Sequence, residues 1–153
     1  MDSVSKKRIA EYVQLLQKGR TMTARFRLSM NEDKAYEFLL AAVIAEVQFR
    51  YRKFVYNDFI DDQLRQMAKW LTTVTPKFGI VLCGGCGNGK TTMLKALQNL
   101  VRRLQIRKPT ATTESIYGAY YGLRIVDALQ IAQLCKTNHA KYLELVQDDM
   151  LAI

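Results

Sequence analysis

The 153-residue chain has a single histidine, two prolines, eight glycines and only three cysteines. An odd number of cysteines does not suggest a disulfide framework, so we expect a protein of the reducing cytoplasm. So few prolines and glycines exclude a low-complexity chain rich in these residues. The longest apolar run of the N-terminal half, residues 38–45, is far shorter than the roughly 20 residues that cross a bilayer. No continuous apolar segment follows the basic N-terminus, so we expect neither a secretory signal nor membrane association.

The composition is that of a soluble globular protein. Hydrophobic residues make up 49% of the chain and charged residues 24%. This balance argues against intrinsic disorder, which needs low hydrophobicity and high charge. The length allows one domain, or one domain with a small attachment.

Acidic residues are missing from one long stretch of the chain. The formal net charge is +9, and residues 81–109 contain six Lys or Arg and no Asp or Glu. Such a stretch favours a polyanionic partner, either the phosphates of a nucleotide or a nucleic acid. The alternative is a solvated basic face with no specific partner.

The first part of the chain has the periodicity of helices. Apolar side chains recur at helical spacing in three stretches, residues 6–18, 35–49 and 60–71. Ser29, with Glu32 three positions later, is a capping-box pattern that predicts the start of the second helix. Asn57 or Asp58 is expected to cap the third helix, and Pro76 to end the region. We therefore predict an N-terminal helical region, residues 1–76, that serves partner binding or oligomerisation.

The second part of the chain alternates between strand and helix patterns. The predicted elements are a buried strand at residues 79–83, a helix from Lys90 to Leu104, a strand at 122–126, helices capped by Asp127 and Asn138, and the start of a third strand at 150–153. This alternation predicts a parallel sheet covered by helices. Residues 77–153 are therefore expected to form an α/β region.

One motif in the second part has a specific chemical meaning. Residues 84–91 match the phosphate-loop pattern G-x-x-x-x-G-K-[ST] without a mismatch, between a predicted strand and a predicted helix. Its glycines let successive N–H groups point into one concavity at the positive end of the following helix. We expect ATP or ADP with Mg²⁺ to bind here, with Lys90 on the β- and γ-phosphates, Thr91 on Mg²⁺ and Thr92 in a minor phosphate contact. The predicted nucleotide-binding residues are Gly84, Gly85, Cys86, Gly87, Asn88, Gly89, Lys90, Thr91 and Thr92. The alternative is a glycine-rich turn that binds nothing.

Two cysteines of this region raise the alternative of a zinc or redox site. Cys83 and Cys86 form a C-x-x-C pattern, but zinc needs about two more ligands. The remaining candidates, Cys135 and His139, are more than 45 residues away. Cys86 also lies inside the phosphate loop, so we expect these cysteines to have a small packing role.

The motif and its surroundings resemble a known family. The segment FGIVLCGGCGNGKTTMLKAL, residues 78–97, resembles the first strand, Walker A loop and first helix of AAA+ ATPases. More narrowly, it is similar to the bacterial helicase-loader (DnaC-like) and IstB-like transposition-helper group, for which C-G-x-C-G-x-G-K-T-T is typical. The resemblance covers residues 55–153 well and 1–54 weakly. It implies a P-loop NTPase fold with an AAA+-like parallel sheet. It also implies a role in helicase loading or transposition, with DNA and a replicative helicase or transposase as partners.

The chain departs from this family at its end. Residues 150–153 correspond to the apolar strand of Walker B, and the two acidic residues of that motif would follow them. The sensor residue and arginine finger of the family are missing as well. We therefore expect the front part of an ATPase, from a natural or a cloned truncation, with a sheet that is incomplete at the C-terminus. No catalytic residue is assigned, turnover by this chain alone is expected to be negligible, and a homo-oligomer would compensate for the missing strands.

Basic clusters suggest how DNA would bind. The first comprises Arg102, Arg103, Arg107 and Lys108, and the second Arg50, Arg52 and Lys53 interleaved with aromatic residues. Arg and Lys can contact phosphates, and aromatic rings can stack on single-stranded bases, so we expect binding without sequence preference. The alternatives are an ordinary solvated helix face and core aromatics. Two other functions remain open: a binding module without turnover, and a small-molecule P-loop kinase.

Overall fold

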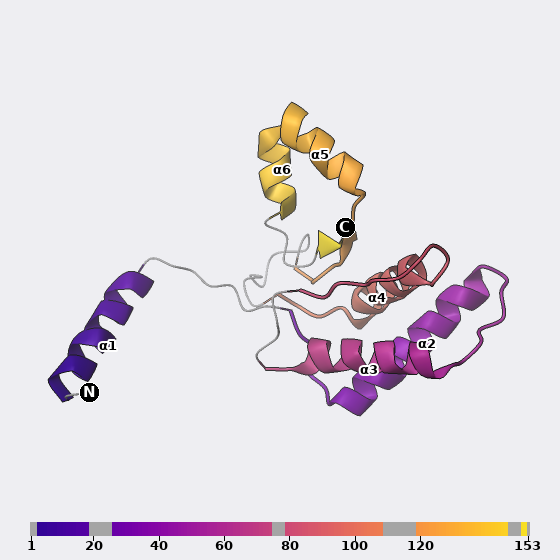
Figure 1. The fold of residues 1–153 in the computed structure, drawn as a ribbon, viewed down its shortest axis with the longest axis horizontal. Helices are drawn as coiled ribbons and strands as arrows, with labels where there is room; N and C mark the ends of the chain where they lie inside the picture. The colour runs from indigo at the N-terminus through magenta and orange to yellow at the C-terminus, as the bar shows by residue number, and fades with distance from the viewer. Residues whose placement is uncertain (1–2, 19–25, 75–78, 109–118, 147–150, 153) are drawn as a thin grey trace.

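The computed structural model describes residues 3–18, 26–74, 79–108, 119–146 and 151–152. These ranges contain α1 (Ser3–Gln17), α2 (Glu32–Phe49), α3 (Asp58–Thr72), α4 (Lys90–Leu104), β1 (Arg124–Ile125), α5 (Ala128–Thr137), α6 (His139–Val146) and β2 (Leu151–Ala152) (Figure 1). The predicted helices therefore exist, and α4 has the predicted bounds. The predicted stop at Pro76 lies outside the described residues.

The predicted fold class, a P-loop NTPase with an AAA+-like parallel sheet, is wrong. Within the described ranges the protein is mostly helical, and its strands form one sheet of only two strands. The apolar face of α2 packs against both α3 and α4, and of these three helices α4 contacts β1 of the small sheet.

The main cause of this difference is the segment at residues 79–83. None of the described residues forms a strand there or pairs with it. Its side chains are largely outside the core, since Val81 is 83% exposed and Ile80 37%. A buried parallel strand needs neighbours that take up its backbone hydrogen bonds and cover both of its faces. Without such neighbours among the described residues, the apolar run does not form a strand.

The sheet that does form pairs only the second and third of the predicted strands, in parallel. Arg124 of β1 pairs with Leu151 of β2, and Ile125 pairs with Ala152. The N–H of Val126 extends the ladder by donating to the carbonyl of Ala152 at 2.9 Å. The helical hairpin of α5 and α6 makes the crossover that parallel strands need.

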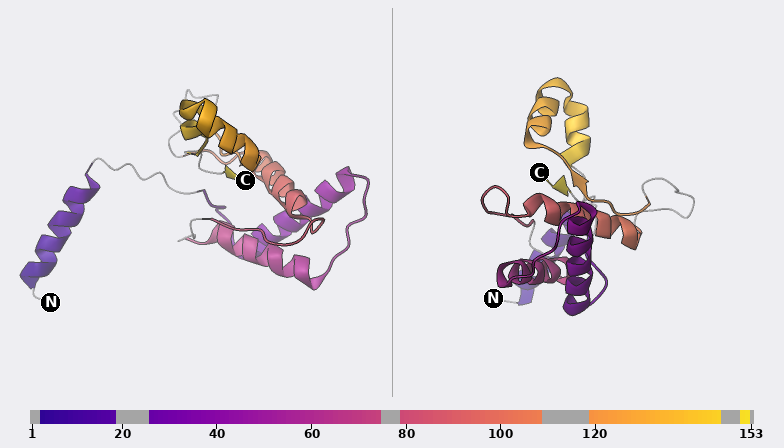
Figure 2. Two further views of the ribbon diagram at one scale, coloured as in Figure 1. Left: turned by 45° about the horizontal axis from the view of Figure 1, so that its top comes forward. Right: turned by 90° about the vertical axis from the view of Figure 1, so that its right-hand side faces the viewer.

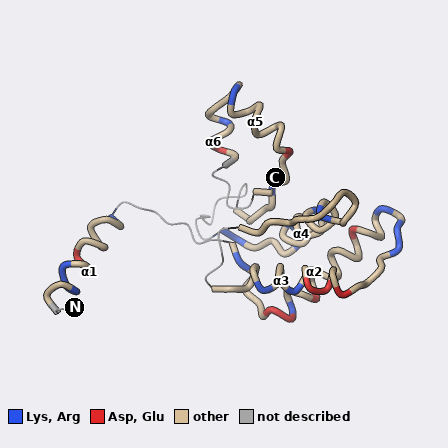
Figure 3. The backbone as a smooth tube through the Cα atoms, viewed as in Figure 1, with Lys and Arg blue, Asp and Glu red and all other residues tan. Residues whose placement is uncertain are grey.

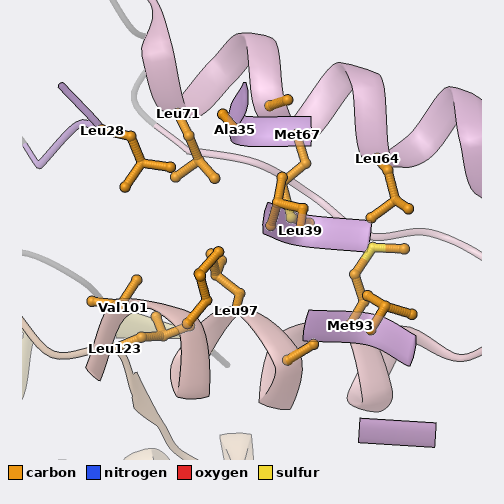
Figure 4. Packing of buried hydrophobic residues seen from close by; sticks show 14 of the residues in the cluster. Leu28, Ala35, Leu39, Leu64, Met67, Leu71, Met93, Leu97, Val101 and Leu123 are labelled. Atoms are coloured by element: carbon orange, nitrogen blue, oxygen red, sulfur yellow. The ribbon is translucent and has the colours of Figure 1, made fainter. Parts of the chain in front are cut away.

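The hydrophobic core lies between three helices. Leu39 of α2, Leu64 of α3 and Val101 of α4 are among the most deeply buried side chains. Figure 4 shows α3 and α4 on opposite sides of α2, with their leucine and methionine side chains pointing inward. Pairs of helices bury apolar stripes in this way because residues three and four positions apart share one face. The core therefore joins α4 directly to α2, and through α2 to α3.

The remaining helices lie apart from this core. Every described side chain of α1 is exposed, and two views show this helix away from the other elements (Figures 1 and 2). The hairpin of α5 and α6 lies next to the small sheet, away from α2 and α3 (Figure 1). Among the helices that the structure describes, none is both long and apolar enough to cross a membrane.

Candidate phosphate-binding site

The candidate site begins at the N-terminus of α4. Gly87 and Gly89 have φ angles of +85° and +78°, in the left-handed region where a side chain is strained. Gly89 is the N-cap of α4, so no side chain caps the helix, and its first turn contains no acidic residue. By contrast, α2, α3 and α5 are capped by the side chains of Asn31, Asn57 and Asp127. The first N–H groups of α4 are therefore left for another acceptor, at the positive end of the helix dipole.

Lys90 is folded back onto the loop. Its Nζ donates hydrogen bonds of 2.7 Å to the carbonyl oxygens of Gly84 and Gly85. The ammonium group thus lies over the glycine-rich turn, from which it can move to a phosphate by side-chain rotation alone. The predicted contact of Lys90 with phosphates stays a prediction, and the sequence did not indicate that the loop supplies acceptors for its ammonium group.

The two threonines that follow have different surroundings. Thr91 is exposed, and its hydroxyl is the only ligand for Mg²⁺ that the sequence assigned. Thr92 is half-buried, and its Oγ1 accepts a hydrogen bond of 3.2 Å from Nη1 of Arg50. Nη2 of the same guanidinium donates to Oε1 of Glu46 at 2.8 Å. The end of α2 therefore contributes a fixed arginine to the first turn of α4.

An apolar pocket of about 200 Å³ adjoins the loop. One side is formed by Asn88, Gly89 and Thr92 of the phosphate loop and α4. The other side is formed by α2, α3 and the chain between them, through Val43, Val47, Lys53, Phe54, Val55, Ile60 and Gln63. Met93 of α4 also lines the pocket. Sequence reasoning missed this pocket because its walls come from segments about 40 residues apart.

The connection between α2 and α3, which forms part of the pocket, is fastened by a polar cluster. Oδ1 of Asp61 accepts hydrogen bonds from the hydroxyls of Tyr36 and, at 2.6 Å, Tyr56. Oδ2 accepts from Nε of Arg65 at 2.9 Å. These bonds, first of all the one from Tyr36, lower the pKa of Asp61 to about 2. The bond to Asp61 raises the pKa of Tyr56 above its ordinary value.

The cysteines near the loop are free and exposed, so they do not take the predicted packing role. In the parts of the chain that the structure describes, no group of three or more His, Cys, Asp or Glu could hold a metal ion.

The two predicted basic clusters lie at opposite ends of α4. Arg102 and Arg103 are exposed in its last turn, about 15 Å from Thr92 by the rise of an α-helix. In Figure 3 the connection between α2 and α3, which contains Arg52 and Lys53, is a separate basic segment. The structure thus brings Arg50 to the phosphate loop and leaves the Arg102 cluster away from it.

A second depression lies beside the Arg102 cluster. Arg107 forms an isolated antiparallel bridge with Tyr120, a residue that is 49% exposed. Lys108, which follows Arg107 in the chain, lines an open groove of about 430 Å³. The other residues that line this groove are Gln98, Gly122, Leu123, Arg124 and Ile125. Arg124 was not a candidate in the sequence analysis, because it was read only as part of a strand.

Comparison of the chain with models of protein families, with curated proteins and with solved structures found no match. Function must therefore be argued from the geometry described above and from the motif.

Proposed function

We propose that the protein binds ATP or ADP, with Mg²⁺, through residues 84–92. The observation that carries the proposal is the helix α4, whose N-terminus has no side-chain cap and lies behind a glycine-rich turn with Lys90 folded over it. Such an end offers N–H donors, a positive dipole and a cation to one phosphate chain. Thr91 supplies a hydroxyl for Mg²⁺, whose other ligands would be phosphate oxygens and water.

The neighbouring pocket supports a nucleotide as the source of the phosphates. Its volume of about 200 Å³ is below the roughly 300–1,000 Å³ typical of whole small-molecule sites, so it suits one planar ring. Phe54, Val47 and Ile60 provide apolar surface for such a ring. In this arrangement the nucleoside would occupy the pocket and the phosphates the loop.

The process that this binding would serve is proposed from the resemblance alone. The likeness of residues 78–97 to the helicase-loader and IstB-like group supports a role in replication or transposition, in which nucleotide binding is coupled to single-stranded DNA and a helicase or transposase. A binding module without turnover remains the second reading, because no residue here is assigned a catalytic role.

Replacement of Lys90 tests the proposal. Lys90→Ala removes a charge-assisted hydrogen bond, which is worth about 1.5–3 kcal/mol, so we expect affinity for Mg²⁺–ATP to fall at least about tenfold in titration calorimetry. Lys95→Ala is the matched control, because Lys95 is an exposed lysine of the same helix, five residues from Lys90. Equal affinity of wild type and Lys90→Ala would contradict nucleotide binding at this loop.

A further inference from the structure

Arg50 occupies a position that the phosphate-loop motif does not account for. It is the C-cap of α2, 42 residues before Thr92, yet its guanidinium donates to the hydroxyl of Thr92 at 3.2 Å. Glu46, one turn earlier in α2, holds the other end of the guanidinium at 2.8 Å. The side chain of Glu46 is only 13% exposed and that of Arg50 37%, so the pair is partly shielded from water. The arginine is therefore placed by α2 and aimed at α4.

This position is electrostatically unfavourable unless an anion is present. The N-terminus of a helix behaves as a partial positive charge, and a cation placed there is repelled. The first turn of α4 has no acidic residue that would offset the repulsion, and it contains a second cation, Lys90. Glu46 compensates for one charge of the two. A phosphate chain at the loop would compensate for the rest.

Arg50 also retains donors for such a ligand. A guanidinium carries five N–H groups in a planar fork, a geometry that matches two oxygens of a phosphate. The bonds to Thr92 and Glu46 come from two different terminal nitrogens, Nη1 and Nη2. Each of these nitrogens has a second N–H, so the arginine can bind a phosphate oxygen without leaving Glu46.

We propose that Arg50 is a ligand of the phosphate chain, contributed by α2 to the site that α4 forms, with Glu46 as the residue that positions it. The inference rests on the proposed nucleotide binding and adds to it a contact from outside the motif. The arginine would join the bound phosphates to α2, so that the packing of α2 on α4 becomes part of the site.

Affinities of single variants for two probes test this assignment. Mg²⁺–ATP measures binding of the whole nucleotide, and inorganic tripolyphosphate measures binding of the phosphates alone. We expect Arg50→Gln and Arg50→Ala to bind both probes about tenfold or more weakly than wild type, because a charge-assisted bond is lost. Arg50→Lys keeps the charge but not the fork, so its affinity should be intermediate. Arg52→Ala removes the same charge from an exposed position nearby and should bind both probes as wild type does.

The possible outcomes separate this inference from the proposal beneath it. If Lys90→Ala weakens binding but Arg50→Gln does not, Arg50 is not a ligand and nucleotide binding stands. If the Arg50 variants lose ATP but keep tripolyphosphate, their effect comes from the neighbouring pocket, and the inference is wrong. If Arg50→Ala and Arg52→Ala lose the same affinity for both probes, the loss is a general effect of charge, and the inference is wrong. If wild type binds neither probe, both proposals fall.

The experiment does not depend on a fragile variant. The (i, i+4) pair of Arg50 and Glu46 is only partly shielded from water, and helix pairs of this spacing contribute about 0.3–0.5 kcal/mol to folding. Thermal unfolding of each variant shows whether it is folded. If Arg50→Ala is not folded, Arg50→Gln takes its place, because it keeps a polar amide at this position.

Discussion

At the scale of single residues, the cluster around Asp61 has the strongest electrostatic signature among the described residues. Its carboxylate is stabilised by hydrogen bonds from Tyr36 and Tyr56 and by the bond and charge of Arg65. The guanidinium of Arg65 also lies 4.5 Å from the centre of the Tyr36 ring. All of these interactions favour the charged form of Asp61, which explains the direction of its pKa.

We predict that Asp61 makes stability depend on acidity between about pH 4 and pH 2. Its pKa in the folded protein is about 2, below the roughly 3.9 of an unfolded chain. The stabilisation is therefore fully present above pH 4 and is lost as the pH falls through the folded value. Denaturant unfolding from pH 7 to pH 2 should show a smaller acid-induced loss for Asp61→Asn, and a lower stability at pH 7.

Asp62→Asn is the control for that measurement. It neutralises the neighbouring carboxylate, whose partner is the side-chain amide of Gln66 at 2.7 Å, and removes no bond to a tyrosine. An unchanged acid profile of Asp61→Asn would contradict the prediction.

At the scale of elements, the start of α2 shows where sequence reasoning chose a wrong residue. The pattern of Ser29 and Glu32 predicted a cap at Ser29. In the structure the cap is Asn31, whose Oδ1 accepts from the N–H of Lys34 at 2.9 Å. Serine and asparagine are both good capping residues, and only the direction in which the chain enters the helix decides between Ser29 and Asn31. That direction is set by tertiary contacts of the preceding segment, in which the N–H of Leu28 donates to the carbonyl of Leu71.

We predict that the two positions respond differently to alanine. Asn31→Ala should lower the free energy of unfolding by about 1 kcal/mol, the usual cost of losing an N-cap. Ser29→Ala should change it by less than about 0.5 kcal/mol, because Ser29 is exposed. Urea unfolding of the two variants measures both values. If Ser29→Ala loses more free energy of unfolding than Asn31→Ala, Ser29 is the cap, as the capping-box pattern predicted.

The difference between local signals and tertiary contacts also explains what could be predicted of the other elements and of the site. Helices such as α3 follow from their own periodicity and from caps such as Asn57, which are local signals. The segment at residues 79–83 has an equally clear apolar pattern, but a strand depends on partners elsewhere in the chain. The motif predicts where a phosphate would bind, whereas the contact of Arg50 with Thr92 is a tertiary contact that no spacing in the sequence reveals.

At the scale of the whole molecule, positive charge gathers near both ends of α4. One region adjoins the phosphate loop, and the other surrounds the far end of α4, where Arg107 and Lys108 pair with the chain around Tyr120. The open groove beside Lys108 and Arg124 is lined by basic and polar groups. Arg102 and Arg103 also stabilise the negative end of the α4 dipole, which would be their whole role if no nucleic acid binds.

We predict salt-dependent binding of single-stranded DNA at this second region. Each phosphate contact contributes about −0.7 to the slope of log affinity against log salt. Neutralising Arg102, Arg103 and Arg107 together should therefore reduce the slope by about 2 and weaken binding similarly for unrelated sequences. Fluorescence anisotropy with labelled oligonucleotides measures both effects.

The control for DNA binding removes as many charges elsewhere. Lys6, Lys7 and Arg8 are exposed on α1, which lies apart from the core. Their triple replacement by alanine should leave the slope unchanged. If the variant at the end of α4 binds as tightly as wild type at every salt concentration, that cluster is a solvated surface.

The bonds of Lys90 to Gly84 and Gly85 have a consequence for the affinity of the proposed binding. In the free protein the ammonium group of Lys90 is bound to two carbonyl groups of the loop, and a phosphate has to displace them. Binding then includes an opening step, and only the fraction of molecules with a released lysine accepts the ligand. Because side-chain rotation is fast, opening would not limit the association rate. The internal bonds would instead compete with the ligand for the ammonium group and so lower the observed affinity.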